Sequence, residues 1–442
     1  MTSPRDHPLA WLLGFSDPER GVGWNPRASS DPFWKPGRAR ALLDLAGAPD
    51  RALRVVTIAG TNGKGSTGAF LESIAAAAGR RTGVCSQPHL HVFRERIRLD
   101  GSPIAQPLFA RHVASLEAVV ERLRARHPAA GEPTTFELTT VLAALAFAEA
   151  GVDLAIFDVG IGGRLDPVNA LHPTLALLTS IGLDHTNVLG HTLGAIAAEK
   201  AGVMRPGVVA LSARQRSAAA GVLAREANRL GARLAFVDPL GPAGPAVDGT
   251  QPVTLTDRGQ SAEARLSLLG AHQRQNGALA VRAAEELDLP LDAVRAGLAG
   301  ARWPGRLEWV PGQPPVLLDG AHNPDGARAL AAALAQLAGR TPYGLIFGCA
   351  RDKDAAGMLR QLLGRAAGVW TAAAAEPRAT PPDALAAIIR RLGRRAEPAA
   401  SVASALAAAR AGGTRLVVVA GSLRVVAEAR QALNLAPQEE PA

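Results

Sequence analysis

The sequence has few of the features that mark secreted or membrane-spanning proteins. Its two cysteines, Cys85 and Cys349, are too few for a disulfide framework, do not stand in a metal-ligand spacing, and fit a reducing cytoplasm. No run of about 18 apolar residues occurs, because the best candidate, residues 141–157, is interrupted by Glu149 and Asp153. The first residues lack a basic segment ahead of a long apolar core, so no signal peptide is expected. These absences predict a cytoplasmic protein with no membrane partner.

Aromatic side chains are also scarce, at 4% of residues, although the formal net charge is +9. Surfaces that bind nucleic acids usually combine cations with aromatic rings, whereas here the arginines lie among alanines, as in residues 121–130. The composition therefore favours small anionic substrates and no nucleic-acid partner. A nucleotide-dependent nucleic-acid-binding protein is the alternative from another class, which steep salt-dependent retention on nucleic acid would favour.

Lysine is the scarcest charged residue. The chain has 48 lysines and arginines, of which only Lys35, Lys64, Lys200 and Lys353 are lysines. An isolated surface lysine is most often a solvated charge. However, lysine has a pKa that burial can shift, whereas arginine stays protonated. A lysine that is kept in a chain that otherwise uses arginine can therefore do chemistry that a guanidinium group cannot. The sequences around Lys64 and Lys200 support that interpretation.

The hydrophobic pattern alternates between buried strands and helices. Strands are expected within residues 53–60, 82–86, 153–160, 174–180 and 207–212, and a helix within residues 136–150. A second alternating series runs from about residue 303 to the C-terminus, with strands expected within residues 314–319, 343–348, 366–374 and 414–420. The Pro- and Gly-rich residues 238–252 are expected to form a loop or a break, and a domain boundary is expected between Leu289 and Trp303. The pattern predicts an α/β protein with mostly parallel sheets.

The segment AGTNGKGST, residues 59–67, follows the first expected strand and precedes a helix. Glycines let the backbone turn tightly and approach a phosphate group, and the helix N-terminus adds positive potential. Lys64 can donate to β- and γ-phosphates, and Ser66 or Thr67 can reach a Mg²⁺ ion or a phosphate oxygen. The spacing differs from the common phosphate loop because Gly65 separates Lys64 from Ser66. A nucleotide site is nevertheless predicted.

Acidic and imidazole groups follow two other expected strands. Asp158 comes at the end of one strand, and Asp184 and His185 follow another. Ligands of open α/β sheets bind at the carboxyl ends of strands, and carboxylates suit Mg²⁺. A single acid or histidine in such a place is more often structural. Together, beside a phosphate loop, they predict a metal–phosphate site.

The motifs GTNGKGS, PHL with ERIR, GIGGRLD, TSIGLDH, EKAG, WPGRLE and DGAHNP follow one another between residues 57 and 425. In sequence and order they resemble the folylpolyglutamate synthase/dihydrofolate synthase family of Mur-ligase-like enzymes. The resemblance implies a large N-terminal P-loop ATPase domain, residues 1–298, which also binds the pterin, and a smaller Rossmann-like C-terminal α/β domain, residues 299–442, for glutamate. A monomer is expected.

The resemblance also implies a reaction. ATP would phosphorylate the carboxylate of dihydropteroate or the γ-carboxylate of a folate, and L-glutamate would then attack the acyl phosphate. Mg²⁺ would accompany ATP, with K⁺ as a further candidate cation. A cell-wall Mur-type amino-acid ligase is the alternative within the enzymes, although GGRLD and PHL argue against it.

Residue roles implied by the resemblance cover both domains. Lys64, Lys200 and His322 match catalytic positions, with Lys200 as a carbamylated lysine and His322 also at the incoming glutamate. Metal ligation would involve Asp158, His185, Lys200 and Gln87. The nucleotide would contact Thr61, Asn62, Gly63, Lys64, Gly65, Ser66, Asn276, Arg306 and Asp319, and the pterin would contact Thr134, Leu165 and Asp166.

The chain departs from the family pattern at three places. Asp158 stands where a glutamate is usual, so its carboxylate reaches one methylene less. Gln87 stands where a serine ligand is usual, with Ser86 one residue away. Residues 23–43 follow the family's N-terminal pterin-contacting segment only loosely.

Overall fold

The computed structural model describes residues 7–16, 34–246 and 249–437. Up to residue 300 the chain forms, in order, α1 (Pro8–Leu13), α2 (Trp34–Leu45), η2 (Pro49–Ala52), β1 (Val55–Ala59), α3 (Lys64–Ala77), β2 (Thr82–Cys85), η3 (Phe93–Arg96), β3 (Ile97–Leu99), β4 (Ser102–Pro103), α4 (Gln106–Arg126), η4 (Pro128–Ala130), α5 (Thr135–Glu149), β5 (Leu154–Asp158), η5 (Pro167–Ala170), β6 (Pro173–Leu178), α6 (Thr186–Leu189), α7 (Leu193–Ala201), β7 (Val209–Ala213), α8 (Ser217–Leu230), β8 (Arg233–Val237), β9 (Gly241–Pro242), β10 (Gln251–Asp257), β11 (Gln260–Leu266), α9 (Ala271–Glu286) and α10 (Leu291–Gly300).

The eight-stranded sheet of this part has the order β4-β3-β2-β5-β1-β6-β7-β8. The strands from β2 to β8 in this order are parallel, whereas β3 and β4 add an antiparallel edge. All five residues of β1 are buried, as expected for a strand covered on both faces. Strand β1 lies between β5 and β6, so the segments that follow these three strands meet at one edge of the sheet. The predicted mostly parallel α/β architecture is confirmed.

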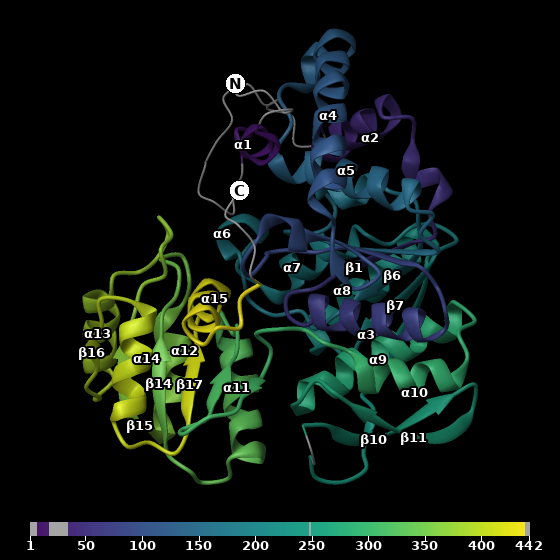
Figure 1. Cartoon of the computed structure of the whole chain (residues 1–442). Coiled ribbons are helices and arrows are strands. Elements are labelled where there is room, and N and C mark those ends of the chain that lie inside the picture. Colours follow the sequence, from purple (N-terminus) through teal and green to yellow (C-terminus); the bar gives the residue numbers. More distant parts are fainter. Residues whose placement is uncertain (1–6, 17–33, 247–248, 438–442) are drawn as a thin grey trace.

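Alternate residues of β1 face two hydrophobic cores. Val55 and Ala59 pack with α1, α2, α4, α5, α7 and α8, whereas Val56 and Ile58 pack with α3, α9 and α10. Figure 1 shows α1, α2, α4 and α5 above the sheet and α3, α9 and α10 below it. The sheet is therefore enclosed between two helical layers, and only its edges and strand ends are open to ligands.

A small antiparallel sheet, β11-β10-β9, lies beyond α9 and α10. Strand β9 and the first two residues of β10 fall within residues 238–252, for which the sequence predicted a loop or a break, and the rest of β10 and all of β11 follow. Val253 and Leu255 face the core below the main sheet, while Thr254 and Thr256 alternate with them. The strands form because this alternation buries one face against α9, a contact that the local pattern alone did not reveal.

After residue 300 the chain forms β12 (Glu308–Val310), β13 (Val316–Leu318), α11 (Pro324–Leu337), β14 (Tyr343–Phe347), α12 (Ala355–Leu362), η6 (Leu363–Arg365), β15 (Ala366–Thr371), α13 (Pro382–Arg391), β16 (Glu397–Pro398), α14 (Val402–Ala411), β17 (Val417–Ala420) and α15 (Leu423–Ala432). The sheet order is β12-β13-β17-β14-β15-β16, with β12 antiparallel and the others parallel. Helices α11, α12 and α13 cover one face, and α14 and α15 cover the other. This is the smaller C-terminal α/β domain that the sequence predicted.

The two sheets lie side by side (Figure 1). Helices α11 and α15, on opposite faces of the C-terminal sheet, are the helices of that domain that lie nearest to the larger domain. The predicted division at 298/299 falls in the last turn of α10, and the exact boundary stays a prediction. Throughout the parts of the chain that the structure describes, every helix is too short or too polar to cross a lipid bilayer. Residues 17–33, which include much of the predicted N-terminal pterin-contacting segment, lie outside the described residues.

Candidate active site

The phosphate loop is attached to the segment that follows β6. The backbone amides of Thr61 and Asn62 donate to the carbonyl oxygen of Ser180, at 2.9 and 3.2 Å. The hydroxyl group of Thr61 donates to the Gly182 carbonyl and accepts from the Gly182 amide. Gly60 has a φ of +149°, and a Cβ there would lie 1.8 Å from the Thr179 hydroxyl oxygen. The close contact of the two strand ends therefore requires glycine at this position.

Lys64 and Lys200 meet at this loop. The Nζ atoms donate to the same acceptor, the Gly60 carbonyl oxygen, at 3.1 Å from Lys64 and 2.9 Å from Lys200. Burial and the neighbouring Lys64 charge lower the pKa of Lys200 to about 7. Burial also lowers the pKa of Lys64, although the carboxylates of Asp158 and Asp184 oppose that shift. Lys200 therefore has an amine that can lose its proton near neutral pH, as carbamylation requires.

Helix α7 brings Lys200 to the loop, and the GGRLD segment holds that helix in place. The Arg164 amide donates to the Glu199 carbonyl at 2.9 Å, and the Arg164 guanidinium pairs with the Glu199 carboxylate at 2.5 Å. Gly202 is required because a Cβ there would lie 2.4 Å from the Arg164 Cα. The motifs GIGGRLD and EKAG are thus one packed unit that positions Lys200.

Helix α9 closes the phosphate loop from below the sheet. The Asn276 side-chain amide donates to Gln273 at 2.8 Å, and Gln273 donates to the Ser66 hydroxyl at 3.3 Å. Gly63 has a φ of +94°, and a Cβ there would lie 2.3 Å from the Asn276 Oδ1 atom. Asn276 therefore supports the loop directly, and Gln273, which the sequence reasoning missed, is its partner.

Trp303 packs against Gly65 at the start of α3, where a Cβ would lie 2.6 Å from the indole ring. The guanidinium group of Arg98 stacks over the same ring at 5.2 Å and pairs with Glu72 of α3 at 2.6 Å. The segment that enters the C-terminal domain is therefore fixed to the helix that begins at Lys64. Its sequence signal was the tryptophan of WPGRLE, to which no role was assigned.

Asp158 ends β5 beside the loop. Its carboxyl group is buried, and Oδ1 has no hydrogen-bond partner among the described residues. Burial raises the pKa of Asp158 to about 7, against the opposing charge of Lys64. The Thr67 hydroxyl, also buried, lacks a hydrogen-bond partner in the same part of the chain. An unpartnered buried carboxylate oxygen indicates a place for a cation or a donor that is not part of the protein.

Asp184 connects the two domains. Its carboxylate pairs with the Lys353 amine at 2.6 Å, accepts from the Asn323 amide at 3.1 Å, and lies 3.5 Å from the His322 Nε2 atom. Burial opposes ionisation, but the His322 contact and the Lys353 charge hold the pKa of Asp184 well below its usual range. Asn62 also exchanges hydrogen bonds with Asn323, at 3.0 and 3.3 Å. The structure thus brings His322 to the phosphate loop and adds Lys353 and Asn323, which the sequence reasoning missed.

His185 follows Asp184 in a left-handed backbone conformation, with φ of +49°. Burial and the nearby Lys353 and Lys64 charges lower its pKa to about 4, although Asp184 acts in the opposite direction. The imidazole is therefore neutral at physiological pH, as a metal ligand must be.

Arg306 and Asp319 lie together on the C-terminal side. The Asp319 carboxylate accepts from the amides of Leu307 and Ala321, both at 2.9 Å. Arg306 approaches Gly320 so closely that a Cβ there would lie 2.2 Å from its Nη1 atom, and burial lowers its pKa. Within the described residues its guanidinium group has no hydrogen-bond or ion-pair partner, so it is available for an anionic ligand.

Of the predicted pterin residues, Asp166 contacts the GIGG segment directly. Thr134 caps α5 and accepts from the Glu137 amide, and Leu165 is half-buried. Asp166 is buried, with a pKa raised to about 7 by burial, and accepts from the amides of Gly160, Ile161 and Val168. A Cβ at Gly160 would lie 2.2 Å from the Gln87 side-chain nitrogen and 3.1 Å from the Phe136 ring. Gln87 is therefore close to Asp166, and Phe136, which the sequence reasoning did not name, lies against the same glycine.

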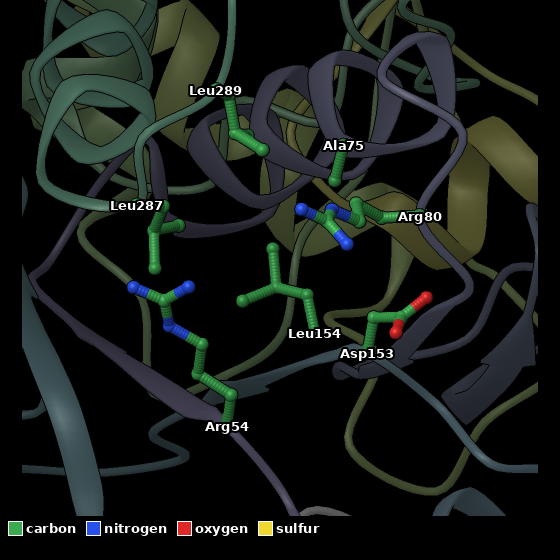
Figure 2. A pocket seen from close by; sticks show the side chains of 7 residues that line it. All are labelled: Arg54, Ala75, Arg80, Asp153, Leu154, Leu287 and Leu289. Atoms are coloured by element: carbon green, nitrogen blue, oxygen red, sulfur yellow. The ribbon is translucent and has the colours of Figure 1, made fainter.

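A separate cavity of about 230 Å³ opens at the opposite edge of the main sheet, before β1 and β5 (Figure 2). Arg54, Arg80 and Leu154 line it together with Leu287 and Leu289. None of the predicted site residues reaches this cavity, so it is not part of the candidate active site.

The comparisons with known proteins define first the class of enzyme. A domain described as Mur ligase, glutamate ligase domain, matches residues 305–423. Together with the nucleotide loop of the larger domain, this match identifies an ATP-dependent ligase of the Mur type.

Relatives of known activity narrow the class. The dihydrofolate synthase/folylpolyglutamate synthase of Bacillus subtilis is 38% identical over 341 residues, which cover 74% of this chain and 78% of that protein. A Mycobacterium tuberculosis folylpolyglutamate synthase complexed with ADP has a TM-score of 0.87 at 34% identity, covering 93% of this chain and 97% of that one. E. coli FolC in complex with DHPP and ADP has a TM-score of 0.80 at 30% identity, covering 98% of each chain. The chain therefore belongs to the folylpolyglutamate synthase/dihydrofolate synthase family, and the predicted resemblance is confirmed.

Proposed function

We propose that this chain uses ATP to join L-glutamate to dihydropteroate, to the γ-carboxylate of tetrahydrofolate, or to both. Family membership supports glutamate ligation to a folate acceptor, in preference to a cell-wall precursor. The observation that carries the proposal is the contact of Asp184, beside the phosphate loop, with Lys353, Asn323 and His322 of the glutamate-ligase domain. The nucleotide and glutamate halves of the site thus meet at one carboxylate.

The chemistry needs two steps. An acceptor carboxylate oxygen attacks the γ-phosphorus of ATP and ADP leaves. The glutamate nitrogen then attacks the acyl carbon, the C–O bond to phosphate breaks, and the nitrogen loses a proton. Lys64 and Arg306, whose guanidinium group has no partner among the described residues, can both hold phosphate oxygens. Aligning the acceptor with ATP reduces the entropic part of the barrier.

His322 can accept the proton. Its Nδ1 atom lies 2.9 Å from the Gly320 carbonyl, which can only accept, so Nδ1 carries the hydrogen and Nε2 is left as the basic nitrogen. Nε2 faces Asp184, whose negative charge would stabilise the imidazolium. Lys353 and Asn323 both donate to this carboxylate and so also suit a carboxylate of glutamate.

The residues present fit Mg²⁺ at the phosphate loop. Within the described parts of the chain, a buried oxygen of Asp158 has no hydrogen-bond partner, and His185 is neutral. In the described residues, however, no three His, Cys, Asp or Glu side chains form a ready metal cluster. A carbamylated Lys200 and the amide oxygen of Gln87 would add to Asp158 and His185 the hard oxygen ligands that Mg²⁺ prefers. We propose that Asp158, His185, Gln87 and carbamylated Lys200 hold Mg²⁺, which would neutralise phosphate charge.

The test measures ADP release with dihydropteroate or tetrahydrofolate, each with and without L-glutamate. Glutamate-dependent ADP release with either folate acceptor, and none with UDP-muramoyl peptides, is expected. Release with the muramoyl peptides alone would contradict the proposal.

We further expect a cytoplasmic monomer. Size-exclusion chromatography with light scattering would measure its oligomeric state.

A further inference from the structure

A short loop of the larger domain contacts the C-terminal domain beside α15. Leu90 packs against the core formed by β13, β17, α14 and α15, and lies 3.7 Å from the position of a Cβ on Gly305. The Glu95 carboxylate accepts from the amides of Leu90, His91 and Val92, which fixes the loop. His89 and His91 therefore have defined positions against the arginines of α15.

His89 lies between two guanidinium groups. Arg96 donates to its Nδ1 atom at 2.9 Å, and the Nη1 atom of Arg424 lies 3.2 Å from its Nε2 atom. A neutral imidazole offers one acceptor and one N–H, and an imidazolium offers two N–H groups. If Nδ1 accepts from Arg96, Nε2 carries hydrogen and points its N–H toward the N–H groups of Arg424. The two donors then converge without an acceptor between them.

Arg424 also lacks a carboxylate partner, unlike its neighbour on the same helix. Arg430 pairs with Glu308, donates to His91 at 3.2 Å and donates to the Leu435 carbonyl at 2.8 Å. Among residues 7–16, 34–246 and 249–437, no acidic side chain forms an ion pair with Arg424. A half-buried guanidinium group without an anion has lost hydration without a compensating partner, which favours a ligand that supplies one.

The position of Arg424 lies between the two halves of the proposed site. On one side, Leu423 packs against Gly320. Gly320 also contacts Arg306 and precedes His322 by two residues. On the other side, the loop leads back from His89 to Gln87, which lies against Gly160 beside Asp166. A folate acceptor whose pterin lies near Asp166 and whose reacting carboxylate lies at the phosphate loop would bring its glutamyl portion toward Arg424.

We infer that Arg424 and the Nε2–H group of His89 bind the α-carboxylate of the terminal glutamyl residue of a folate acceptor. This inference rests on the proposed function and assigns a further substrate contact within it. An oxygen of that carboxylate placed near both donors accepts from the imidazole and the guanidinium group together. Dihydropteroate has no α-carboxylate, because its only carboxylate is the one that reacts. Arg424 thus distinguishes the two acceptors.

The test compares both acceptors in Arg424→Gln. The KM for tetrahydrofolate is expected to rise about tenfold or more, as for the loss of a charged hydrogen bond, while the KM for dihydropteroate and for glutamate changes less than about twofold. Activity with dihydropteroate shows that the variant is folded. Arg415→Gln, which removes an exposed arginine with the same change of charge, is the control and is expected to leave both KM values unchanged.

A second arm uses a tetrahydrofolate analogue whose α-carboxylate is an amide. The wild-type enzyme is expected to bind it more weakly than tetrahydrofolate, and Arg424→Gln is expected to bind the two about equally. The inference would be overturned by equal effects of Arg424→Gln on both acceptors or by an unchanged KM for tetrahydrofolate. A raised KM for ATP instead would also overturn it, because it would indicate that Arg424 binds a phosphate group. No ligation by the wild-type enzyme with either acceptor would instead contradict the proposed function.

Discussion

Lys64 and Lys200, 136 residues apart in the chain, donate to one carbonyl oxygen, that of Gly60, at 3.1 and 2.9 Å. Burial, together with the repulsion between two ammonium groups at one acceptor, lowers the pKa of Lys200 to about 7. Conversion of Lys200 to a carbamate would replace this repulsion by an attraction between an anion and Lys64. The contact therefore explains why two of the few lysines stand at these positions.

Lys64→Ala is expected to abolish glutamate-dependent ADP release, because the phosphates lose a fixed positive charge. The expected loss is about 10²–10³-fold in kcat, typical of the removal of one electrostatic contact to a transition state. Steady-state assays at saturating ATP measure it, and thermal unfolding checks that the fold is intact. More than about a tenth of wild-type turnover would show that the loop has another role.

Lys200→Ala and Lys200→Arg are both expected to be nearly inactive. Arginine keeps the positive charge but cannot form a carbamate at neutral pH, so it should not substitute. Added bicarbonate or a short carboxylate is expected to restore part of the activity of Lys200→Ala by filling the vacated space. Near-normal turnover of Lys200→Arg would show that Lys200 acts as a cation.

Carbamylation of Lys200 is expected to follow pH. Because the folded-state pKa is about 7 and not the usual value near 10.5, the reactive neutral amine forms as pH rises through 7. About a tenth of the amine is neutral at pH 6 and about nine tenths at pH 8. At constant dissolved ¹³CO₂, a carbamate signal in ¹³C NMR spectra should grow across this range and be missing in Lys200→Arg. A signal in that variant would place the carbamate elsewhere.

Arg306→Ala is expected to raise the KM for ATP about tenfold, with a smaller effect on the binding of the folate acceptor. The reason is that its guanidinium group, close to Gly320, has no partner in the described protein, and its charge acts on Lys64 of the phosphate loop. Steady-state kinetics for ATP and equilibrium binding of the acceptor provide the two measurements. Unchanged ATP kinetics would show that the C-terminal domain does not complete the nucleotide site.

Cys85 and Cys349 are expected to resist thiol reagents in the folded protein. Burial raises the pKa of Cys85 to about 12 and that of Cys349 to about 11. Thiolate is the reacting form, and at pH 8 at most about one thiol in a thousand is ionised. Titration with a chromogenic disulfide should therefore detect both thiols only in denaturant. Rapid reaction of the native protein would contradict the buried positions.

The sequence by itself determined the inner strands of both sheets, the phosphate loop and the family, whereas the edge strands β3, β4, β8, β12 and β16 were not predicted. Each of these features is written locally: continuous apolar runs predict buried parallel strands, and the glycines around Lys64 allow a backbone turn that few other residues permit. The small sheet formed by β9, β10 and β11 was missed because two half-exposed strands next to Pro and Gly have a weak local pattern.

Only the tertiary structure decided which distant groups meet. Lys353 reaches Asp184 from the other domain, Trp303 packs on Gly65, and Arg424 faces His89, although nothing near these residues in the sequence indicates their partners. Such contacts depend on the order of strands, on the docking of one sheet beside the other, and on the burial that shifts the pKa of Lys200. These are properties of the packed chain, and a local pattern cannot encode them because each partner lies more than a hundred residues away.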